Sequence, residues 1–461
     1  MENFWDFKVW GFFCVIAVLL ISLLVANVLK KSIKFLRVSL IPTSVLGGAV
    51  LIIVAGIYKW ITGDIMFDTA IFGGNGTAML ELITYHTLAL GFIASAFKSS
   101  KGKLNGKRAV EIFNTGVNTV STYLLQAVCG FAISLVAVYF VKDFFPAAGV
   151  LLPFGYGQGT GQALNYGTIY EGMGFTGGKS FGLTIAALGF ISASIGGVIH
   201  LNVLRKKGKI GNSKYEEGKI SSEQIQSENE IPMQESIDKL TVQMALICLA
   251  YLLAFALMFL LGKLLPGMKA VIYGFNFLLG VISATLVKVA INLLKKKKAI
   301  KKDYVNDFLM TRVSNFFFDI MVVAGIAAIR LGALKDYWGI ILIMGFVGLA
   351  ITYLYNLLTA RTLFKDYSEE QFLTMYGMLT GTASTGIILL RELDGDFKTP
   401  AADNLVYQNF PAIVFGFPLM LLATLAPQRP YLTFIILIAF FLLMNVILFR
   451  SFIFRKKNKK K

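Results

Sequence analysis

Long apolar runs separated by short polar stretches dominate the sequence. A membrane helix needs about 20 residues, because each residue adds 1.5 Å and the hydrocarbon core is about 30 Å thick. Eleven runs meet this requirement, so we predict an all-α integral membrane protein with about 11 transmembrane helices. The predicted spans are 10–29, 40–60, 77–97, 118–141, 181–204, 240–262, 270–294, 308–331, 338–358, 403–426 and 431–452.

Two stretches interrupt this pattern with polar, glycine-rich sequence. The first reads LPFGYGQGTGQALN over 152–165, and the second reads YGMLTGTASTG over 376–386. Both contain a Gly-Thr pair, at Gly159 and at Gly381. Glycine weakens a helix, and polar groups are costly against lipid. A pair of interruptions in corresponding positions of two halves is the best sequence indicator of a transporter's binding site.

The order of the apolar runs also repeats along the chain. Gly381 follows Gly159 by 222 residues, and the same offset carries the run at 181–204 onto the run at 403–426. Earlier runs correspond with a drift of roughly ten residues. We therefore predict two five-helix repeats, each with a re-entrant or broken helix. The predicted organisation is a first repeat over 1–204 with its interruption at about 147–173, a cytoplasmic linker over 205–239, a second repeat over 240–426 with its interruption at about 371–391, and an extra helix with a basic tail over 427–461.

Positive charge predicts how the chain crosses the membrane. The formal net charge is +18, and its clusters lie between apolar runs, which is typical of cytoplasmic loops and of contact with an anionic leaflet rather than with nucleic acid. All clusters fall on one side only if each interrupted segment enters and leaves on the same side. The second repeat is then inverted, with the N-terminus outside and the linker and C-terminal tail cytoplasmic. The clusters are 30–37, 98–108, 205–219, 295–302 and 455–461.

The interrupted segments supply candidate ligands. Non-helical backbone at membrane depth is tolerated only inside protein or beside water. Its carbonyls and the nearby hydroxyls suit Na⁺, around Gly159, Thr160, Gly381 and Thr382, and helix N-termini suit a carboxylate. Alternatively, the glycines only permit close helix packing. The candidate binding residues are Gly157, Gln158, Gly159, Thr160, Gly161, Gln162, Asn165, Thr380, Gly381, Thr382, Ser384 and Thr385.

Three further polar residues are candidates. Asp319 lies near the middle of a predicted span, where an ionisable group is a functional hypothesis by default: a Na⁺ ligand, a proton carrier or half of an ion pair. Gln126 contributes either to the binding site or to a hydrogen bond between helices. Arg391 follows the second interruption and either holds a substrate carboxylate bidentately or pairs with Glu392 or Asp394.

No catalytic or metal-binding constellation occurs in the sequence. The three cysteines and two histidines have no metal-ligand spacing. The stretch 172–177 fits G-x-G-x-x-G, but no strand precedes it and no βαβ unit surrounds it. We therefore expect neither an enzyme nor an organic cofactor, and no nucleic-acid partner.

The motifs IPTSVLGG at 41–48, GQGTG at 157–161 and the second glycine-rich segment together resemble the bacterial glutamate:sodium symporter family. The resemblance covers most of the chain, except the linker and the last helix. It implies a homodimeric secondary transporter in the bacterial plasma (inner) membrane, importing glutamate with Na⁺ as coupling ion by an elevator-like motion. Gln158 stands where the family often has histidine, and Arg391 stands where a neutral polar residue is expected.

Two alternatives to a glutamate symporter stay open. Carriers of other organic anions, such as di- or hydroxycarboxylates, also use glycine-rich re-entrant segments. A scaffold or a channel with the same repeat would not transport by alternating access. We expect Na⁺-coupled symport of glutamate or a similar small carboxylate, with these two as alternatives.

Overall fold

The computed structural model describes the chain except for residues 1–2, 99–105, 209–229, 234–235, 396–397 and 454–461. The described residues are predominantly helical and contain no strand, as the all-α prediction expects. Most of the predicted linker, part of the basic cluster at 98–108 and nearly all of the predicted basic tail lie outside the described residues.

Ten helices among the described residues are long and apolar enough to cross a membrane. A bent helix pair supplies an eleventh if it forms one span, so the prediction of many membrane-spanning helices is confirmed at about ten. The ten helices are α1 (Phe7–Ser32), α3 (Thr43–Thr62), α4 (Gly76–Phe97), α5 (Gly106–Ala137), α8 (Gly178–Lys206), α10 (Lys239–Leu264), α12 (Asn276–Lys296), α13 (Asp307–Ala327), α14 (Trp338–Leu363) and α19 (Pro430–Leu448).

The bent pair corresponds to the run predicted over 403–426. It consists of α17 (Ala401–Tyr407) and α18 (Asn409–Leu425), with a bend of 51° between them. Pro411 follows the break. It has no N–H to donate to the carbonyl four residues earlier, so a straight helix cannot continue through this position.

Two predicted boundaries are wrong. Helix α5 begins at Gly106, twelve residues before the predicted start at 118, because its charged first turns resemble a loop in the sequence. The run predicted over 270–294 is divided at Phe275 into α11 (Lys269–Gly274) and α12. Hydropathy does not detect this division, since apolar residues continue across it.

The chain forms two compact units, each assembled from three separate sections. Unit 1 consists of Met1–Leu23, Gly47–Gly102 and Lys214–Ala327. Unit 2 consists of Leu24–Leu46, Lys103–Ser213 and Ala328–Lys461. Each unit therefore combines sequence from the first and second halves of the chain.

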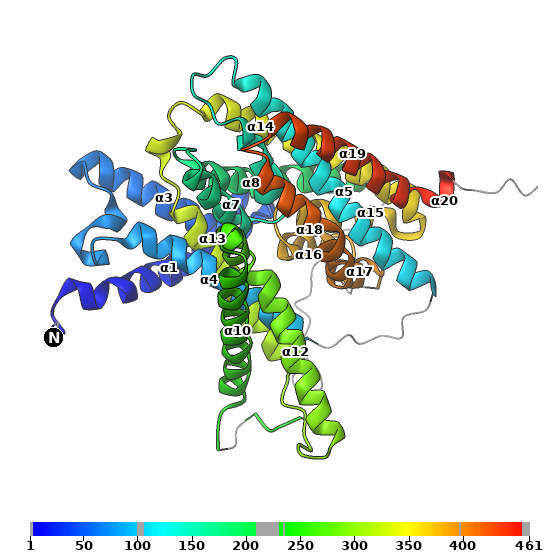
Figure 1. Cartoon of the computed structure of the whole chain (residues 1–461), viewed down its shortest axis with the longest axis horizontal. Helices are drawn as coiled ribbons and strands as arrows, with labels where there is room; N and C mark the ends of the chain where they lie inside the picture. The colour runs from blue at the N-terminus through cyan, green and yellow to red at the C-terminus, as the bar shows by residue number, and fades with distance from the viewer. Residues whose placement is uncertain (1–2, 99–105, 209–229, 234–235, 396–397, 454–461) are drawn as a thin grey trace, which may run out of the picture. The chain divides into compact units, whose positions relative to one another are not determined.

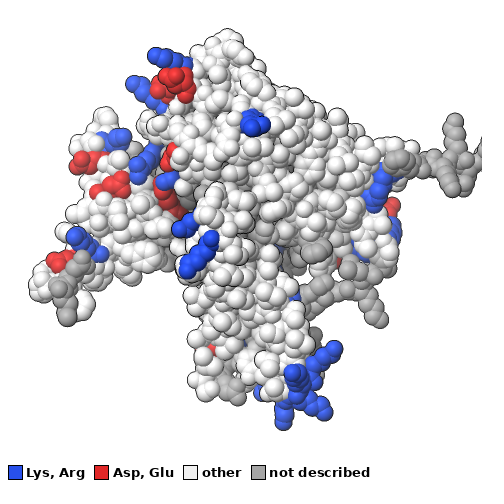
Figure 2. Space-filling view, in the orientation of Figure 1, with Lys and Arg blue, Asp and Glu red and all other residues white. Residues whose placement is uncertain are grey.

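In unit 1, α4 packs against α10, α12 and α13. A Cβ atom at Gly91 would lie 2.8 Å from the Phe318 ring, so α4 and α13 approach closely. The Ser314 hydroxyl also donates to the Gly91 carbonyl over 2.9 Å. Helices α10 and α12 lie side by side (Figure 1). Figure 2 shows few charged side chains between the ends of this pair and basic ones where α12 ends.

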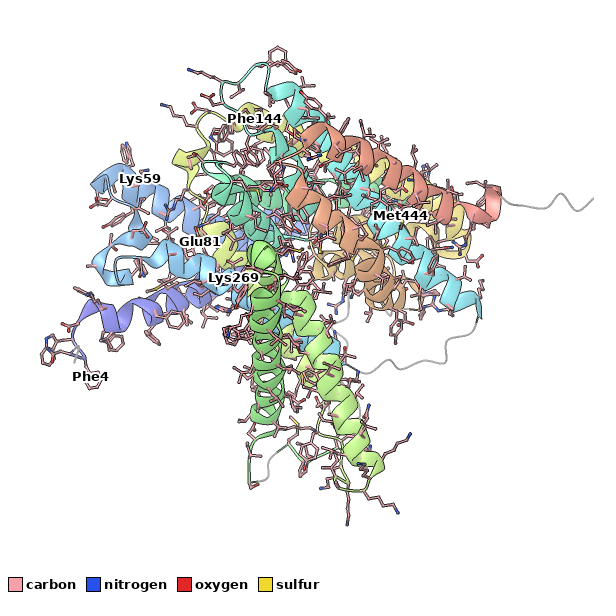
Figure 3. The ribbon with its side chains drawn as sticks, in the orientation of Figure 1. Phe4, Lys59, Glu81, Phe144, Lys269 and Met444 are labelled. Atoms are coloured by element: carbon pink, nitrogen blue, oxygen red, sulfur yellow. The ribbon has the colours of Figure 1, made fainter. Side chains whose placement is uncertain are left out.

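In unit 2, α5 is contacted by α14, α18 and α19. Phe144, labelled in Figure 3, lies in the segment after α5. Its ring packs against Phe175, Phe181 and Tyr337 with centroids 5.5–6.4 Å apart. This aromatic cluster holds together the segments that precede and follow the first interrupted segment. The interrupted segments themselves, with α8 packed against both, form the interior of unit 2.

Candidate functional site: two helix breaks in unit 2

The first interrupted segment is a broken helix. Helix α6 (Leu151–Tyr156) is separated from α7 (Thr160–Gly172) by Gly157, Gln158 and Gly159. Gly159 has φ = +80°, a left-handed conformation that a residue without a Cβ atom adopts at little cost. The Tyr123 hydroxyl donates to the Gly157 carbonyl over 3.1 Å, which satisfies one group at the break.

The second interrupted segment is also a broken helix. Helix α15 (Ser368–Thr380) is separated from α16 (Ala383–Arg391) by Gly381 and Thr382. The Thr382 hydroxyl caps α16 by accepting from the Thr385 amide over 3.4 Å. The Thr380 hydroxyl donates back to the Tyr376 carbonyl over 2.6 Å.

The two breaks meet inside unit 2. A Cβ atom at Gly159 would lie 3.6 Å from the Gly381 carbonyl oxygen and 3.7 Å from the Thr382 methyl carbon. The Gly-Thr pairs of the two halves are therefore in contact, although they lie 222 residues apart in the sequence. The N-termini of α7 and α16 and the C-termini of α6 and α15 consequently converge on one place.

Protein surrounds both broken helices. All of α6 is buried, as are α7 from Thr160 to Gly167 and α15 from Gln371 to Thr380. Polar segments of this kind are tolerated at membrane depth when protein rather than lipid encloses them. At the break itself, Gln158 and Thr382 are only half-buried and Ser384 is exposed, so the convergence point has an accessible edge.

Gln162 carries a buried amide with no partner. Its side chain is 1% exposed, and neither Oε1 nor Nε2 has a hydrogen-bond partner among the described residues. It lies in the first turn of α7, and the residue that precedes this helix, Gly159, supplies no side-chain cap. A buried unpaired amide costs about 1–3 kcal/mol, which a ligand with a donor and an acceptor would recover.

The two segments that form the convergence point contain no formal charge. No acidic or basic residue occurs over 156–167 or 376–390. The helix N-termini carry partial positive charge and favour a carboxylate, whereas the carbonyls at the helix C-termini carry partial negative charge and favour a small cation. A carboxylate and a monovalent cation bound together would leave this buried region neutral.

The structure brings most of the predicted binding residues to these breaks. Gly157, Gln158 and Gly159 form the first break, and Gly381 and Thr382 form the second. The other predicted residues lie within one to two helical turns of a break: Thr160, Gly161, Gln162, Asn165, Thr380, Ser384 and Thr385. Gln126 reaches the second break from α5, because its Nε2 donates to the Leu379 carbonyl and to the Thr352 hydroxyl, both over 2.9 Å.

One predicted residue of unit 2 lies away from the breaks, and another belongs to unit 1. Arg391 is the last residue of α16 and is exposed, about 12 Å along the helix axis from its start at a rise of 1.5 Å per residue. Asp319 lies on α13 in unit 1, where it is exposed.

Sequence reasoning missed the polar interior of α5. Asn118 donates to Asn356 over 2.9 Å, the Thr119 hydroxyl donates to Gln408 over 2.8 Å, and all four residues are buried. The signal was present in the sequence as NTVSTYLLQ over 118–126, a run too polar for a helix surrounded by lipid.

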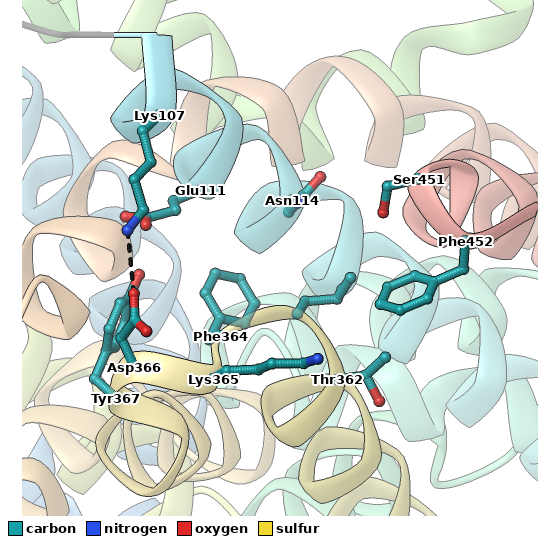
Figure 4. A pocket seen from close by; sticks show the side chains of 11 residues that line it. Lys107, Glu111, Asn114, Thr362, Phe364, Lys365, Asp366, Tyr367, Ser451 and Phe452 are labelled. Atoms are coloured by element: carbon teal, nitrogen blue, oxygen red, sulfur yellow. Dashed lines mark hydrogen bonds and ion pairs between the residues drawn. The ribbon is translucent and has the colours of Figure 1, made fainter. Parts of the chain in front are cut away.

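A separate cavity of about 340 Å³ lies between the start of α5, the turn before α15 and α20 (Arg450–Ile453), as Figure 4 shows. Lys107 and Asp366 at this cavity form an ion pair of 3.1 Å. Glu111 pairs with Arg108 over 2.6 Å. Because these charges already compensate each other, the cavity is a poorer candidate for binding a charged ligand than the breaks.

No protein-family model matches the sequence, and a search of curated proteins found no match. The function is therefore inferred from the geometry of the two breaks.

Proposed function

We propose that this chain is a secondary active transporter that carries glutamate or a similar small carboxylate together with Na⁺, as its resemblance to the glutamate:sodium symporter family implies. The observation that carries the proposal is the meeting of the two breaks at Gly159 and Gly381, beside the unpaired amide of Gln162. Opposed broken helices at a repeat interface are the arrangement by which many transporters bind substrate and ion.

Helix bounds support the inverted repeats that the proposal includes. An offset of 232 residues carries α1 onto α10, α3 onto α12 and α4 onto α13, with every bound within two residues. An offset of 222 carries α8 (Gly178–Lys206) onto the α17–α18 pair, which spans Ala401–Leu425. The start of α5 also follows the offset of 232 onto the start of α14 (Trp338–Leu363), so the change in offset falls between this point and the broken helices.

The division into units supports an elevator-like mechanism. Unit 1 contains α4 and most of α1 and α3 together with their counterparts, whereas unit 2 contains both broken helices and the helices that flank them. In the proposed mechanism unit 2 carries the bound ligands and unit 1 is the scaffold, which also holds two copies together in a homodimer.

Positive charge supports the proposed orientation in a bacterial plasma membrane. Arg37 follows α1 and Arg205 lies in the last turn of α8, and both line one cavity in unit 2. Two of the five basic clusters therefore share an end, as a cytoplasmic placement of both requires. In this orientation the N-terminus is outside and the linker and the C-terminal tail are cytoplasmic.

Charge neutrality gives the coupling a physical basis. The carboxylate binds at the N-termini of α7 and α16, with Gln162 as a hydrogen-bonding partner. Na⁺ binds the carbonyls at the ends of α6 and α15 and the hydroxyls of Thr160 and Thr382. Either ligand alone would bury an uncompensated charge, which is costly. Each ligand therefore raises the affinity of the other by the same factor.

The test is uptake of labelled L-glutamate into proteoliposomes with and without an inward Na⁺ gradient. We expect accumulation only with the gradient, and loss of accumulation in Gln162→Leu. Gradient-dependent uptake of a di- or hydroxycarboxylate in place of glutamate would assign another organic anion. Non-saturating flux would indicate a channel, and sealed vesicles without flux of any of these anions would contradict transport.

A further inference from the structure

A second cavity in unit 2 combines basic and apolar walls. It has a volume of about 230 Å³ and lies between the end of α8 and the segment around α2 (Lys34–Val38) that joins α1 to α3. Its location at the end of a candidate span places it where the hydrocarbon core would meet the headgroups. The lining residues are Arg37, Val38, Leu40, Val198, Leu201, Arg205 and Glu392.

The charges around this cavity are unbalanced. Arg205 donates to Glu392 over 3.1 Å from one terminal nitrogen, and its other terminal nitrogen donates to the Asn202 side-chain oxygen over 3.4 Å. Arg37 is exposed and has no hydrogen-bond or ion-pair partner among the described residues. Two cations therefore share one acid, and the cavity has an excess of positive charge that an anion would compensate.

An exposed apolar stripe leads along α8 to the same cavity. Ile191, Ile195, Ile199 and Val203 are 41%, 48%, 55% and 40% exposed. Their four-residue spacing places them on one side of the helix, and this stripe ends at Val203, two residues before Arg205. A basic cavity at the end of an apolar stripe matches the shape of a phospholipid, with a charged headgroup above an acyl chain.

We propose that this cavity binds the phosphodiester of an anionic phospholipid from the cytoplasmic leaflet. The guanidinium groups of Arg37 and Arg205 bind the phosphate oxygens, since the planar fork of arginine donates two hydrogen bonds to a phosphate. An acyl chain lies along the α8 stripe. Basic pockets at the cytoplasmic ends of membrane helices bind anionic headgroups in this way. The lipid ties the segment Leu24–Leu46 to α8 within unit 2.

The experiment compares lipid binding to the purified full-length protein and three variants. Native mass spectrometry from detergent would measure adducts with phosphatidylglycerol, with phosphatidylcholine as the zwitterionic comparison. Arg37→Gln removes the unpaired cation. Glu392→Gln releases Arg205 from its ion pair. Lys296→Gln is the matched control, because it removes one charge from an exposed position at the end of α12 in unit 1.

We expect phosphatidylglycerol to bind in preference to phosphatidylcholine. Its affinity should fall about tenfold in Arg37→Gln, as loss of a charge-assisted hydrogen bond predicts. It should rise in Glu392→Gln and stay unchanged in Lys296→Gln. Thermal unfolding without added lipid should be the same in all four proteins, because the altered side chains are at least partly exposed.

Three results would overturn the proposal. An equal loss of affinity in Arg37→Gln and Lys296→Gln would indicate general attraction to charge, without a specific cavity. Equal affinity for phosphatidylcholine would remove the role of the anionic headgroup. Saturation of the cavity by soluble glycerol phosphate at the same concentration as the lipid would identify a site for a free phosphate ester, with no contribution from the α8 stripe.

Discussion

The side-chain amide of Gln126 donates a hydrogen bond of 2.9 Å to the main-chain carbonyl of Leu379, one residue before the end of α15. Carbonyls in the last turn of a helix have no intrahelical partner, so α5 supplies one from the other half of the sequence. The position of the second break therefore depends on a residue of α5.

Gln126→Leu should lower the free energy of unfolding by about 1–3 kcal/mol, because it keeps the side-chain volume but leaves the Leu379 carbonyl and the Thr352 hydroxyl without their donor. Chemical denaturation in detergent would measure this change. Thr62→Val is the control, since it removes an exposed hydrogen bond to Tyr58 and should have an effect below about 0.5 kcal/mol. Equal stability of the two variants would contradict this role of Gln126.

Gln162→Leu should stabilise the protein while abolishing uptake. It removes a buried amide without partners, which costs the ligand-free protein about 1–3 kcal/mol. The comparison is Gln371→Leu, because the Gln371 amide donates to Thr115 and accepts from Asn404, over 3.2 and 3.1 Å. Thermal unfolding should move upward in the first variant and downward in the second. A downward shift in both would show that Gln162 is bonded in the folded protein.

Thr382→Ala should weaken both the helix cap and the response to Na⁺. Loss of the cap on α16 lowers stability by about 1 kcal/mol, and loss of the hydroxyl raises the Na⁺ concentration needed for half-maximal uptake. Thr382→Ser keeps the hydroxyl and should restore both properties. Thr285→Ala, on the exposed face of α12, is the control. An unchanged Na⁺ response in Thr382→Ala would remove this residue from the ion site.

We expect the protein to lose stability in acid because of the lowered pKa of the Asp394 carboxyl. Burial alone would raise the pKa of its carboxyl, but hydrogen bonds from the Thr399 hydroxyl and from the Thr399 and Lys398 amides outweigh this effect and lower the pKa. The carboxylate therefore stabilises the fold fully above the ordinary pKa of about 4, and this contribution disappears as pH falls through the lowered value.

Asp394→Asn provides the measurement for this pH dependence. The difference in unfolding free energy between the wild type and the variant should be constant above about pH 5 and should shrink below about pH 4. A difference that stays constant down to the acid limit of folding would show that the Asp394 pKa is the same in the folded and unfolded states.

Gly189→Ala should separate α8 from the second break. Its new Cβ atom would lie 2.4 Å from the Thr380 carbonyl oxygen, a main-chain atom that cannot rotate away. We expect a loss of about 1–3 kcal/mol in stability, typical of overpacking, and a lower uptake rate. Gly172→Ala is the matched control because its Cβ atom would meet no atom within 4 Å. Equal behaviour of the two variants would contradict the close approach of α8 and α15.

The helices could be predicted from the sequence because membrane spans and helix breaks are encoded locally. Twenty apolar residues indicate a span wherever they occur, and the glycines at 157, 159 and 381 indicate an interruption. The start of α5 could not be read in the same way. Lys107 and Arg108 were interpreted as a loop, although charged residues extend a helix readily when they lie beyond the hydrocarbon core.

The arrangement around the breaks was less accessible to sequence reasoning because it depends on tertiary contacts. Matching Gly159 with Gly381 required only their equivalent positions in two halves, but the contact between them follows from the packing of unit 2. The position of Asp319 within a predicted span indicated its depth in the membrane. It did not indicate that the side chain lies on an exposed side of α13. Proximity in sequence placed Arg391 next to the second break, whereas the length of α16 separates the two.

Interleaving of the two units has a consequence for how the protein is made. Helix α4 packs on α13, but α4 ends at Phe97 and α13 begins at Asp307, about 210 residues later in the sequence. At about 5–20 residues per second, the ribosome needs roughly 10 to 40 s to supply α13. The first half of the chain is therefore inserted into the membrane before either unit can be completed, so it depends on the insertion machinery to shield its polar faces from lipid.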